Sequence, residues 1–174
     1  MEMIELLRAR RSARSFKDEP VPGEMIDLLK EALVRAPTSR DNRPWEFVFV
    51  DDRNLLAQLS SAKPHGASFL RDAPLGVVIL ADETKSDVWV EDCAIAAITL
   101  QYQCESLGLG SCWVQIRMRE FAAGISSEKR VKELLHAPDH LRVACIVAIG
   151  FRKRKARETS FDSLPHDRFH TNGF

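Results

Sequence analysis

Two clusters of basic residues are the parts of this sequence whose composition is best suited to chemistry. The first, RARRSAR, places four arginines and one serine within residues 8–14, and the second, RKRKAR, occupies residues 152–157. Guanidinium groups bind phosphate oxygens through paired hydrogen bonds, and a hydroxyl or loop amide adds a neutral donor. The first cluster therefore predicts a site for one phosphate group, although a solvated turn has the same composition. The second cluster fits a solvated surface equally well.

The overall charge argues against a nucleic-acid partner. The chain has 25 basic and 25 acidic residues, so its formal net charge is zero, whereas domains that bind nucleic acid usually carry a basic surplus. The basic clusters also lack interleaved aromatic residues of the kind on which bases stack. Neither GxGxxG nor GxxxxGK[ST] occurs, which excludes the common dinucleotide and nucleotide-hydrolase fingerprints. We expect a small phosphorylated ligand and no nucleic acid.

Length and hydropathy indicate a single domain over residues 1–174. The longest apolar run, residues 73–81, is much shorter than the ~20 residues of a membrane-spanning helix. The N-terminus carries acidic residues among its apolar ones and has no signal-peptide core. The sequence therefore predicts a cytoplasmic protein with no membrane partner.

Hydrophobic periodicity predicts helices that alternate with strands. The expected helices span residues 3–10, 25–36, 53–61, 88–107 and 127–136, and the expected strands span residues 47–50, 75–82, 111–116 and 142–151. The run at 75–82 is apolar throughout, which is typical of a strand covered on both faces. The middle of the fourth helix is apolar all round and predicts a place in the protein centre or at a large interface. This pattern indicates one layered α+β fold that ends in a polar tail.

Other residue types that often carry chemistry have simpler explanations in this sequence. The cysteines lie in apolar surroundings without ligand spacing, and we interpret all four as buried core residues: Cys93, Cys104, Cys112 and Cys145. The five histidines have no partner spacing that marks one as a base, so we assign no catalytic side chain and no metal site. Trp45 and Trp113 fit core positions, and Gln115 fits a strand position that faces water.

Four segments and the C-terminus, in this order, resemble the FMN-dependent nitroreductase family. The segments are RRSARSF at 10–16, APTSRDNRPWEFVFV at 36–50, APLGVVILAD at 73–82 and LGLGSCWVQI at 107–116, and the chain ends in RFHTNGF at 168–174. The resemblance covers essentially the whole chain. It implies a three-layer α-β-α fold with a mostly antiparallel central sheet. It also implies a homodimer in which each flavin lies at the subunit interface and the C-terminal tails are exchanged.

The resemblance also assigns cofactor-binding residues. Arg10, Arg11, Ser12 and Arg14 match the segment that binds the phosphate and ribityl chain of FMN, and Lys155 matches a C-terminal contact to the same phosphate. Thr38, Ser39 and Asp41 match a loop that reaches the flavin of the partner subunit. Trp113, Val114 and Gln115 match a stretch whose backbone follows the isoalloxazine ring and donates an amide near N5.

Two places depart from the family pattern. Family members usually carry Asn and Gln where this chain has Asp41 and Arg43, and Asn42 is an alternative for the usual Asn. The RKRKAR segment replaces a Pro-containing turn, so Arg152, Arg154 and Arg157 compete with Lys155 for the phosphate. The polar contacts of the loop and the identity of the C-terminal cation therefore stay open.

The activity that the resemblance implies is a ping-pong oxidoreduction, in which NAD(P)H delivers hydride to flavin N5 and an electron-poor acceptor, such as a nitroaromatic or a quinone, is then reduced. The flavin carries this chemistry, so the protein only positions the ring and stabilises negative charge near it. The alternative is a flavin-binding protein that senses or delivers the cofactor without turnover. The physiological acceptor and the preference for NADH or NADPH are left undetermined.

Overall fold

The computed structural model describes residues 2–155 and 159–174. Its helices are α1 (Met3–Ala9), α2 (Gly23–Val34), α3 (Arg53–Ser60), α4 (Trp89–Ser106) and α5 (Ser127–Leu135). Its strands are β1 (Trp45–Val50), β2 (Leu75–Asp82), β3 (Gly110–Gln115), β4 (Glu120–Ala122), β5 (Ile125–Ser126) and β6 (Leu141–Gly150). The predicted order of helices and strands is confirmed. The β4–β5 hairpin was not predicted, because strands of three and two residues are too short to produce a periodic pattern.

The central sheet has the strand order β1-β2-β6-β3, and all of its strand pairs are antiparallel. The middle strand β2 pairs with a neighbour on each side: Val78 lies opposite Val48 of β1 and opposite Ile146 of β6. The strand β3, by contrast, lies at an edge of the sheet. The expectation of a mostly antiparallel sheet is therefore confirmed, and the edge strand is the one that carries the predicted flavin segment.

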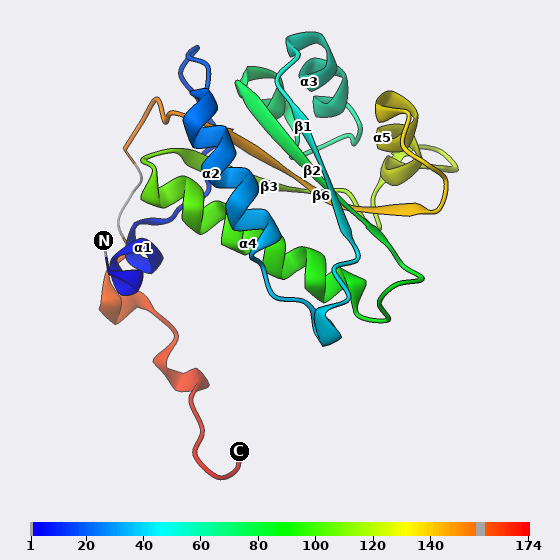
Figure 1. Cartoon of the computed structure of the whole chain (residues 1–174). Coiled ribbons are helices and arrows are strands. Elements are labelled where there is room, and N and C mark those ends of the chain that lie inside the picture. The colour runs from blue at the N-terminus through cyan, green and yellow to red at the C-terminus, as the bar shows by residue number, and fades with distance from the viewer. Residues whose placement is uncertain (1, 156–158) are drawn as a thin grey trace.

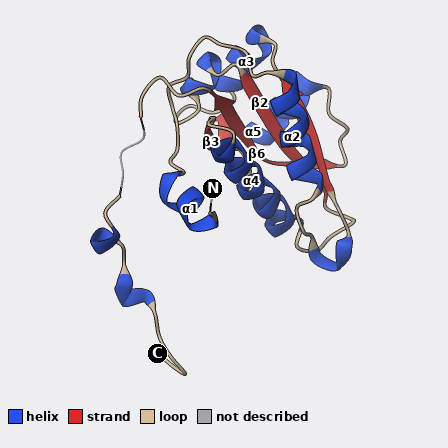
Figure 2. Cartoon of the chain, turned by 60° about the vertical axis from the view of Figure 1, so that its left-hand side comes forward, coloured by secondary structure: helices blue, strands red, loops and turns tan. Residues whose placement is uncertain are grey.

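Helices cover both faces of this sheet, as the two views in Figures 1 and 2 show: α2 and α4 lie on one face, and α3 and α5 on the other. Alternate residues of β2 supply the two cores, because successive side chains of a strand point to opposite faces. Val77 and Ile79 pack with α2 and α4, whereas Val78 and Leu80 pack with α3 and α5. This arrangement confirms the three-layer fold and explains why β2 is apolar throughout.

The helix α4 is only partly covered by the rest of the chain. Cys93, Ala96, Ala97 and Leu100 are buried against the sheet, but Ile95 is 37% exposed. Of the two explanations that the sequence offered for an apolar middle, the buried face supports a central place, and a large interface stays a prediction. All four cysteines are buried and free, in agreement with their interpretation as core residues.

Both ends of the chain project from the sheet and its helices. The C-terminal residues 159–174 extend away from the sheet past α1 (Figures 1 and 2). Large apolar side chains are exposed on both ends, among them Met3 and Ile4 of α1 and Phe169 and Phe174 of the tail. In the described part of the chain, no helix has the length and apolar character needed to cross a membrane.

Candidate functional site

The N-terminal segment that follows α1 lies along the end of the sheet and brings the two basic clusters together. Ser12 forms a parallel bridge with Ser111 at the start of β3, and the Ala13 amide donates to the Ser111 carbonyl at 2.9 Å. Four residues later, Phe16 forms an antiparallel bridge with Arg152, just beyond β6. This second bridge is flanked by bonds from the Lys17 amide to the Phe151 carbonyl, at 2.8 Å, and from the Lys153 amide to the Ser15 carbonyl, at 3.1 Å. Clusters that lie at opposite ends of the sequence thus become neighbours.

A hollow of about 510 Å³ lies between the two clusters, and we call it the basic hollow. It is lined by Arg10, Arg11, Ser12, Ala13, Arg14, Ser15, Arg152, Arg154 and Lys155. The lining contains six cations and two hydroxyls but no carboxylate. Five of the predicted cofactor residues, the four of the N-terminal segment and Lys155, are therefore found in one place. Such a donor set suits a phosphate monoester, which offers several oxygens and a double negative charge.

Unsatisfied donors within the basic hollow support the same conclusion. The Nε atoms of Arg11 and Arg152 are buried and have no hydrogen-bond partner. Buried donors are rarely left unpaired, because each one costs about 1 to 3 kcal/mol. Arg14 is held differently, with its guanidinium 5.9 Å from the centre of the Phe69 ring. Two arginines of the lining therefore each carry a buried donor that no described residue satisfies.

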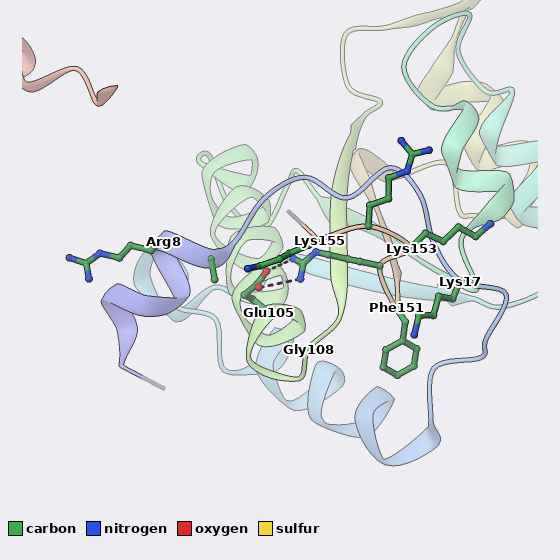
Figure 3. Close-up of a pocket in the computed structure, with 10 residues that line it drawn as sticks. Arg8, Lys17, Glu105, Gly108, Phe151, Lys153 and Lys155 are labelled. Carbon is green, nitrogen blue, oxygen red and sulfur yellow. Dashed lines mark hydrogen bonds and ion pairs between the residues drawn. The ribbon is translucent and has the colours of Figure 1, made fainter. Parts of the chain in front are cut away.

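One carboxylate beside the hollow distinguishes among the C-terminal cations. Glu105, near the end of α4, accepts hydrogen bonds from both terminal nitrogens of Arg152, and the two side chains are only 9% and 17% exposed. Figure 3 shows Glu105 in the adjoining hollow, with Arg8 on one side and Lys17, Phe151 and Lys153 on the other. Because Arg152 is neutralised by this ion pair, it is a weaker candidate for the phosphate than Arg154, and Lys155 is kept as a candidate from the family resemblance. The fourth competitor, Arg157, lies outside the described residues.

Gly108, before β3, and Gly110, its first residue, make the close approach of the chain ends possible. Gly108 has φ +74°, and its left-handed conformation ends α4. Gly110 lies so close to the other segments that a Cβ atom there would be 2.7 Å from Ala13 Cβ and 2.6 Å from Arg152 Cγ. A side chain at position 110 would therefore push the basic clusters away from the sheet.

The open edge of β3 runs on from the basic hollow. The two sides of an antiparallel strand receive the backbone groups of alternate residues. Because the Ser111 carbonyl bonds to Ala13, the backbone groups of Ser111 face away from β6, and so do those of Trp113 and Gln115. The Val114 backbone faces β6 instead, and its side chain is buried in the core with α3 and α5. Trp113 and Gln115 thus present amides at the edge where a flat ligand can receive them.

The side chains of Trp113 and Gln115 are bonded to each other. Trp113 Nε1 donates to Gln115 Oε1 at 2.9 Å, and Gln115 Nε2 donates to the Arg117 carbonyl at 2.8 Å. The Gln115 amide group is therefore fixed in one orientation, rather than simply facing water. Any contact of these two residues with a ligand at the edge is then made by their backbone.

Lys63, which follows α3, is a site residue that the sequence did not indicate. Burial lowers its pKa, and the nearby Arg119 lowers it further, while Cys112 of β3 acts in the opposite direction. Burial raises the pKa of the Cys112 thiol, and Arg14, Ser12, Arg10 and Lys63 oppose that rise. Lys63 and the arginines of the first cluster therefore lie near the same residue of β3, Cys112. A single lysine in a loop has no pattern by which the sequence alone could have identified it.

The loop that contains Thr38, Ser39 and Asp41 is not brought to the basic hollow. Its anchor is Asp92, a residue only 1% exposed, which accepts from the Ser39 amide at 2.8 Å and from the Ser86 hydroxyl at 2.7 Å. Asp92 lies at the start of α4 and Glu105 at its end, ~20 Å apart at 1.5 Å per residue. The loop therefore lies at the opposite end of α4 from the basic hollow of its own chain. The predicted contact to the flavin of a partner subunit stays a prediction.

The residues that depart from the family pattern in this loop are paired with each other. Arg43 Nε donates to Asp41 Oδ1 at 2.7 Å, and Arg43 Nη2 donates to Asp41 Oδ2 at 3.0 Å. Arg40, Asp41 and Arg43 all have positive φ angles, a conformation that side chains rarely adopt. Asn42 lies between them with ordinary helical angles. Nearby, Trp45 packs against the core and lies 5.2 Å from the Phe47 ring, as expected for a core residue.

The chain is similar to known proteins over most of its length. The sequence profile of the nitroreductase family matches residues 7–64 and 56–151. A protein of Archaeoglobus fulgidus, provisionally named an NADH dehydrogenase/NAD(P)H nitroreductase, is 31% identical over 174 residues, which cover 97% of each chain.

Solved structures also match this chain over nearly its full length. An FMN-dependent nitroreductase from Clostridium difficile superimposes with a TM-score of 0.97 at 41% identity, over 99% of this chain and 100% of the other. A protein of Parabacteroides distasonis, provisionally named an NADH dehydrogenase/NAD(P)H nitroreductase, has a TM-score of 0.89 at 32% identity, over 98% of both chains.

Proposed function

Because this chain belongs to the nitroreductase family, we propose that it is an FMN-dependent oxidoreductase that takes hydride from NAD(P)H and reduces an electron-poor acceptor such as a nitroaromatic or a quinone. The observation that carries this proposal is the meeting of the two basic clusters at the start of the open edge of β3. A phosphate site that continues into a row of outward-facing amides matches the two ends of FMN.

The phosphate end is held by the basic hollow. Arg10, Arg11 and Arg14 supply guanidinium donors, Ser12 supplies a hydroxyl, and Lys155 adds a C-terminal cation. When bound, FMN supplies the two-electron chemistry that passes hydride from the donor to the acceptor.

The ring end is oriented by the edge strand. The amides of Trp113 and Gln115 donate towards the ring, and the bond between their side chains keeps this part of the strand rigid. Lys63 supplies a positive charge near Cys112 of this strand, as Arg14 does. Cations and amides that are fixed before the reaction stabilise negative charge at little reorganisation cost. No nucleophilic or acidic side chain is needed for this role.

The complete site needs a second copy of the chain. The loop at 38–43 lies at the opposite end of α4 from the basic hollow of its own chain, and we propose that it contributes to the flavin site of the partner subunit. The exposed apolar residues of α1 and of the tail support such an interface, and an exchanged tail would cover them.

A flavin-binding protein without turnover is the second candidate function. The Asp41–Arg43 ion pair favours it, because these two side chains bond to each other where family members usually carry Asn and Gln. A carrier would bind FMN at the same hollow but would not be reduced by NAD(P)H.

The absorbance spectrum of the purified protein, followed by anaerobic titration with NADH and with NADPH, separates these outcomes. The proposed enzyme has a flavin band that bleaches with a nucleotide and returns when a quinone is added. A band that neither nucleotide bleaches supports the carrier. Absence of the band, with no uptake of added FMN, contradicts both functions.

A further inference from the structure

Two arginines follow directly on the strand that carries the proposed flavin contacts. Arg117 and Arg119 come after the end of β3, and exposed Met118 stands between them. Their positions are fixed by backbone bonds: the Arg117 carbonyl accepts from Gln115 Nε2 at 2.8 Å, and the Arg119 amide donates to the Ile116 carbonyl at 3.1 Å. The Arg119 carbonyl in turn accepts from the Ser127 amide at 2.8 Å. Both residues therefore have a defined place at the far end of the edge from the basic hollow.

Neither guanidinium forms an ion pair with a carboxylate of the described residues. Arg117 Nη1 contacts the Met118 sulfur at 3.1 Å, and Arg119 Nη1 donates to the Met118 carbonyl at 3.2 Å. By contrast, Arg142, at the start of β6, bonds to both Glu83 and Glu128. The two arginines thus keep most of their donors for another molecule.

Packing holds Arg117 in particular close to the edge strand. Its guanidinium carbon lies 5.7 Å from the centre of the Trp89 ring, at the start of α4. A guanidinium stacked on an aromatic face loses little further freedom when it binds an anion. Arg119 is close enough to Lys63 to lower the pKa of that lysine, so a further cation lies near Arg119.

From this juxtaposition we propose that Arg117 and Arg119 bind an acidic group of a substrate that stacks on the flavin, and so make the enzyme selective for anionic substrates. This inference rests on the proposed function, because it takes the ring to lie along Trp113 and Gln115. The acidic group can be a carboxylate or sulfonate of the electron acceptor or a phosphate of the hydride donor. The chemistry of recognition is the same in both cases.

The test compares matched pairs of substrates in each half of the reaction. For the acceptor, kcat/KM is measured with 4-nitrobenzoate and with its uncharged methyl ester, and for the donor, flavin reduction is measured with NADPH and with NADH. The variant is Arg117→Gln with Arg119→Gln, and the control is Arg35→Gln, an exposed arginine of α2 that pairs with Glu31. For each pair we take the ratio of the rate with the more acidic substrate to the rate with its partner. Because the two substrates of a pair share their reacting group, a difference in this ratio between parent and variant reports the acidic group alone.

We expect one of the two ratios to fall about tenfold or more in the variant, as for loss of a charge-assisted hydrogen bond. A fall in the acceptor ratio assigns the site to the acceptor, and a fall in the donor ratio assigns it to the phosphate of NADPH. Both ratios should stay at the parent values in the control, and Arg117→Lys with Arg119→Lys should restore part of the selectivity.

Two results would overturn the inference without touching the proposed function: both ratios unchanged in the variant, or an equal loss with charged and uncharged substrates. Flavin content and thermal unfolding of each variant are measured first to detect a folding defect. If the Gln variant has one, the Lys variant is used in its place. A parent protein that holds no flavin, or whose flavin no nucleotide reduces, removes the proposed function and this inference with it.

Discussion

At the scale of single residues, hydrogen bonding separates cations that have the same charge. Arg152 is neutralised by Glu105 and is buried, whereas Arg10 and Arg14 have no carboxylate partner among the described residues. Both lie in the lining of the basic hollow and are close enough to Cys112 to affect its pKa. We therefore propose Arg10 and Arg14 as stronger phosphate-binding candidates than Arg152, although all three belong to basic clusters.

Replacing Arg10 and Arg14 together by alanine should weaken FMN binding by a few kcal/mol, since each charge-assisted hydrogen bond contributes ~1.5 to 3 kcal/mol. Fluorescence titration of the apoprotein with FMN measures this change. Arg35→Ala is the matched control and should bind FMN as the parent does. A double variant that holds FMN as tightly as the parent would place the phosphate elsewhere.

At the scale of secondary-structure elements, α4 connects several parts of the molecule. Its first turn holds the loop at 38–43 through Asp92, and its last turn holds the C-terminal cluster through Glu105. Its middle packs on the sheet through Cys93 and Leu100. A change at either end of this helix therefore acts on a different part of the proposed site.

The bond between Asp92 and the Ser39 amide should be detectable by hydrogen exchange. Ser39 belongs to a short loop, but its amide donates to a buried carboxylate and should exchange slowly in the parent. Asp92→Ala leaves that amide without its partner, and we expect its exchange to become at least tenfold faster. Asp92→Asn keeps an acceptor oxygen and should restore part of the protection. Equal exchange in all three proteins would contradict the anchoring role of Asp92.

Buried thiols on α4 should make the protein sensitive to alkaline pH. Burial raises the pKa of Cys93 from 9.0 to about 12, and the Asp92 carboxylate contributes to the rise. The unfolded chain releases this proton near pH 9 while the folded chain keeps it. The free energy of unfolding is therefore fully retained below about pH 9 and falls as pH rises towards about 12.

Urea unfolding at a series of alkaline pH values measures this effect. Cys93→Ala removes one of the titrating groups and should make the decline with pH less steep. Cys104 and Cys145, whose thiol pKa values are also raised by burial, should account for the decline that remains. A variant as pH-sensitive as the parent would exclude Cys93 as a contributor.

At the scale of the whole molecule, the exposed apolar surface is concentrated at the two ends of the chain. Phe169 is 81% exposed, and Phe161 and Leu164 of the tail line a hollow together with Ile4 and Leu7 of α1. An exposed apolar surface made of this many side chains is typical of a site that another protein surface covers. The proposed dimer supplies that surface and also brings the loop at 38–43 to a second flavin.

Sedimentation of the full chain at micromolar concentration should therefore give a dimer. Removing residues 159–174 should shift it towards the monomer and weaken FMN binding, because the tail and the interface are lost together. Replacing His65 by alanine, in a loop far from the tail in sequence, serves as a control that should leave the dimer intact. A full-length monomer with FMN bound would contradict the interface model.

Much of the fold follows from local patterns in the sequence. The periodicities at 25–36, 53–61 and 75–82 specify helices and a doubly covered strand because side chains repeat every 3.6 or 2 residues in these elements, whatever surrounds them. Gly108 could be recognised as the end of a helix for the same reason, since few other residues adopt a positive φ. The two basic clusters, and the phosphate site predicted for the first of them, also follow from residue type and spacing alone.

The tertiary structure decided which of these residues act together. Pairing of Ser12 with Ser111 and of Phe16 with Arg152 brings residues 8–14 beside residues 152–155, a contact between segments too far apart in sequence for any local pattern to encode. The same folding pairs Arg152 with Glu105 and brings Lys63 near Arg119 and Cys112. It also anchors the loop at 38–43 on Asp92, at the opposite end of α4 from the basic hollow. Side-chain chemistry is a property of each residue, but proximity depends on long-range packing, and only the folded chain determines it.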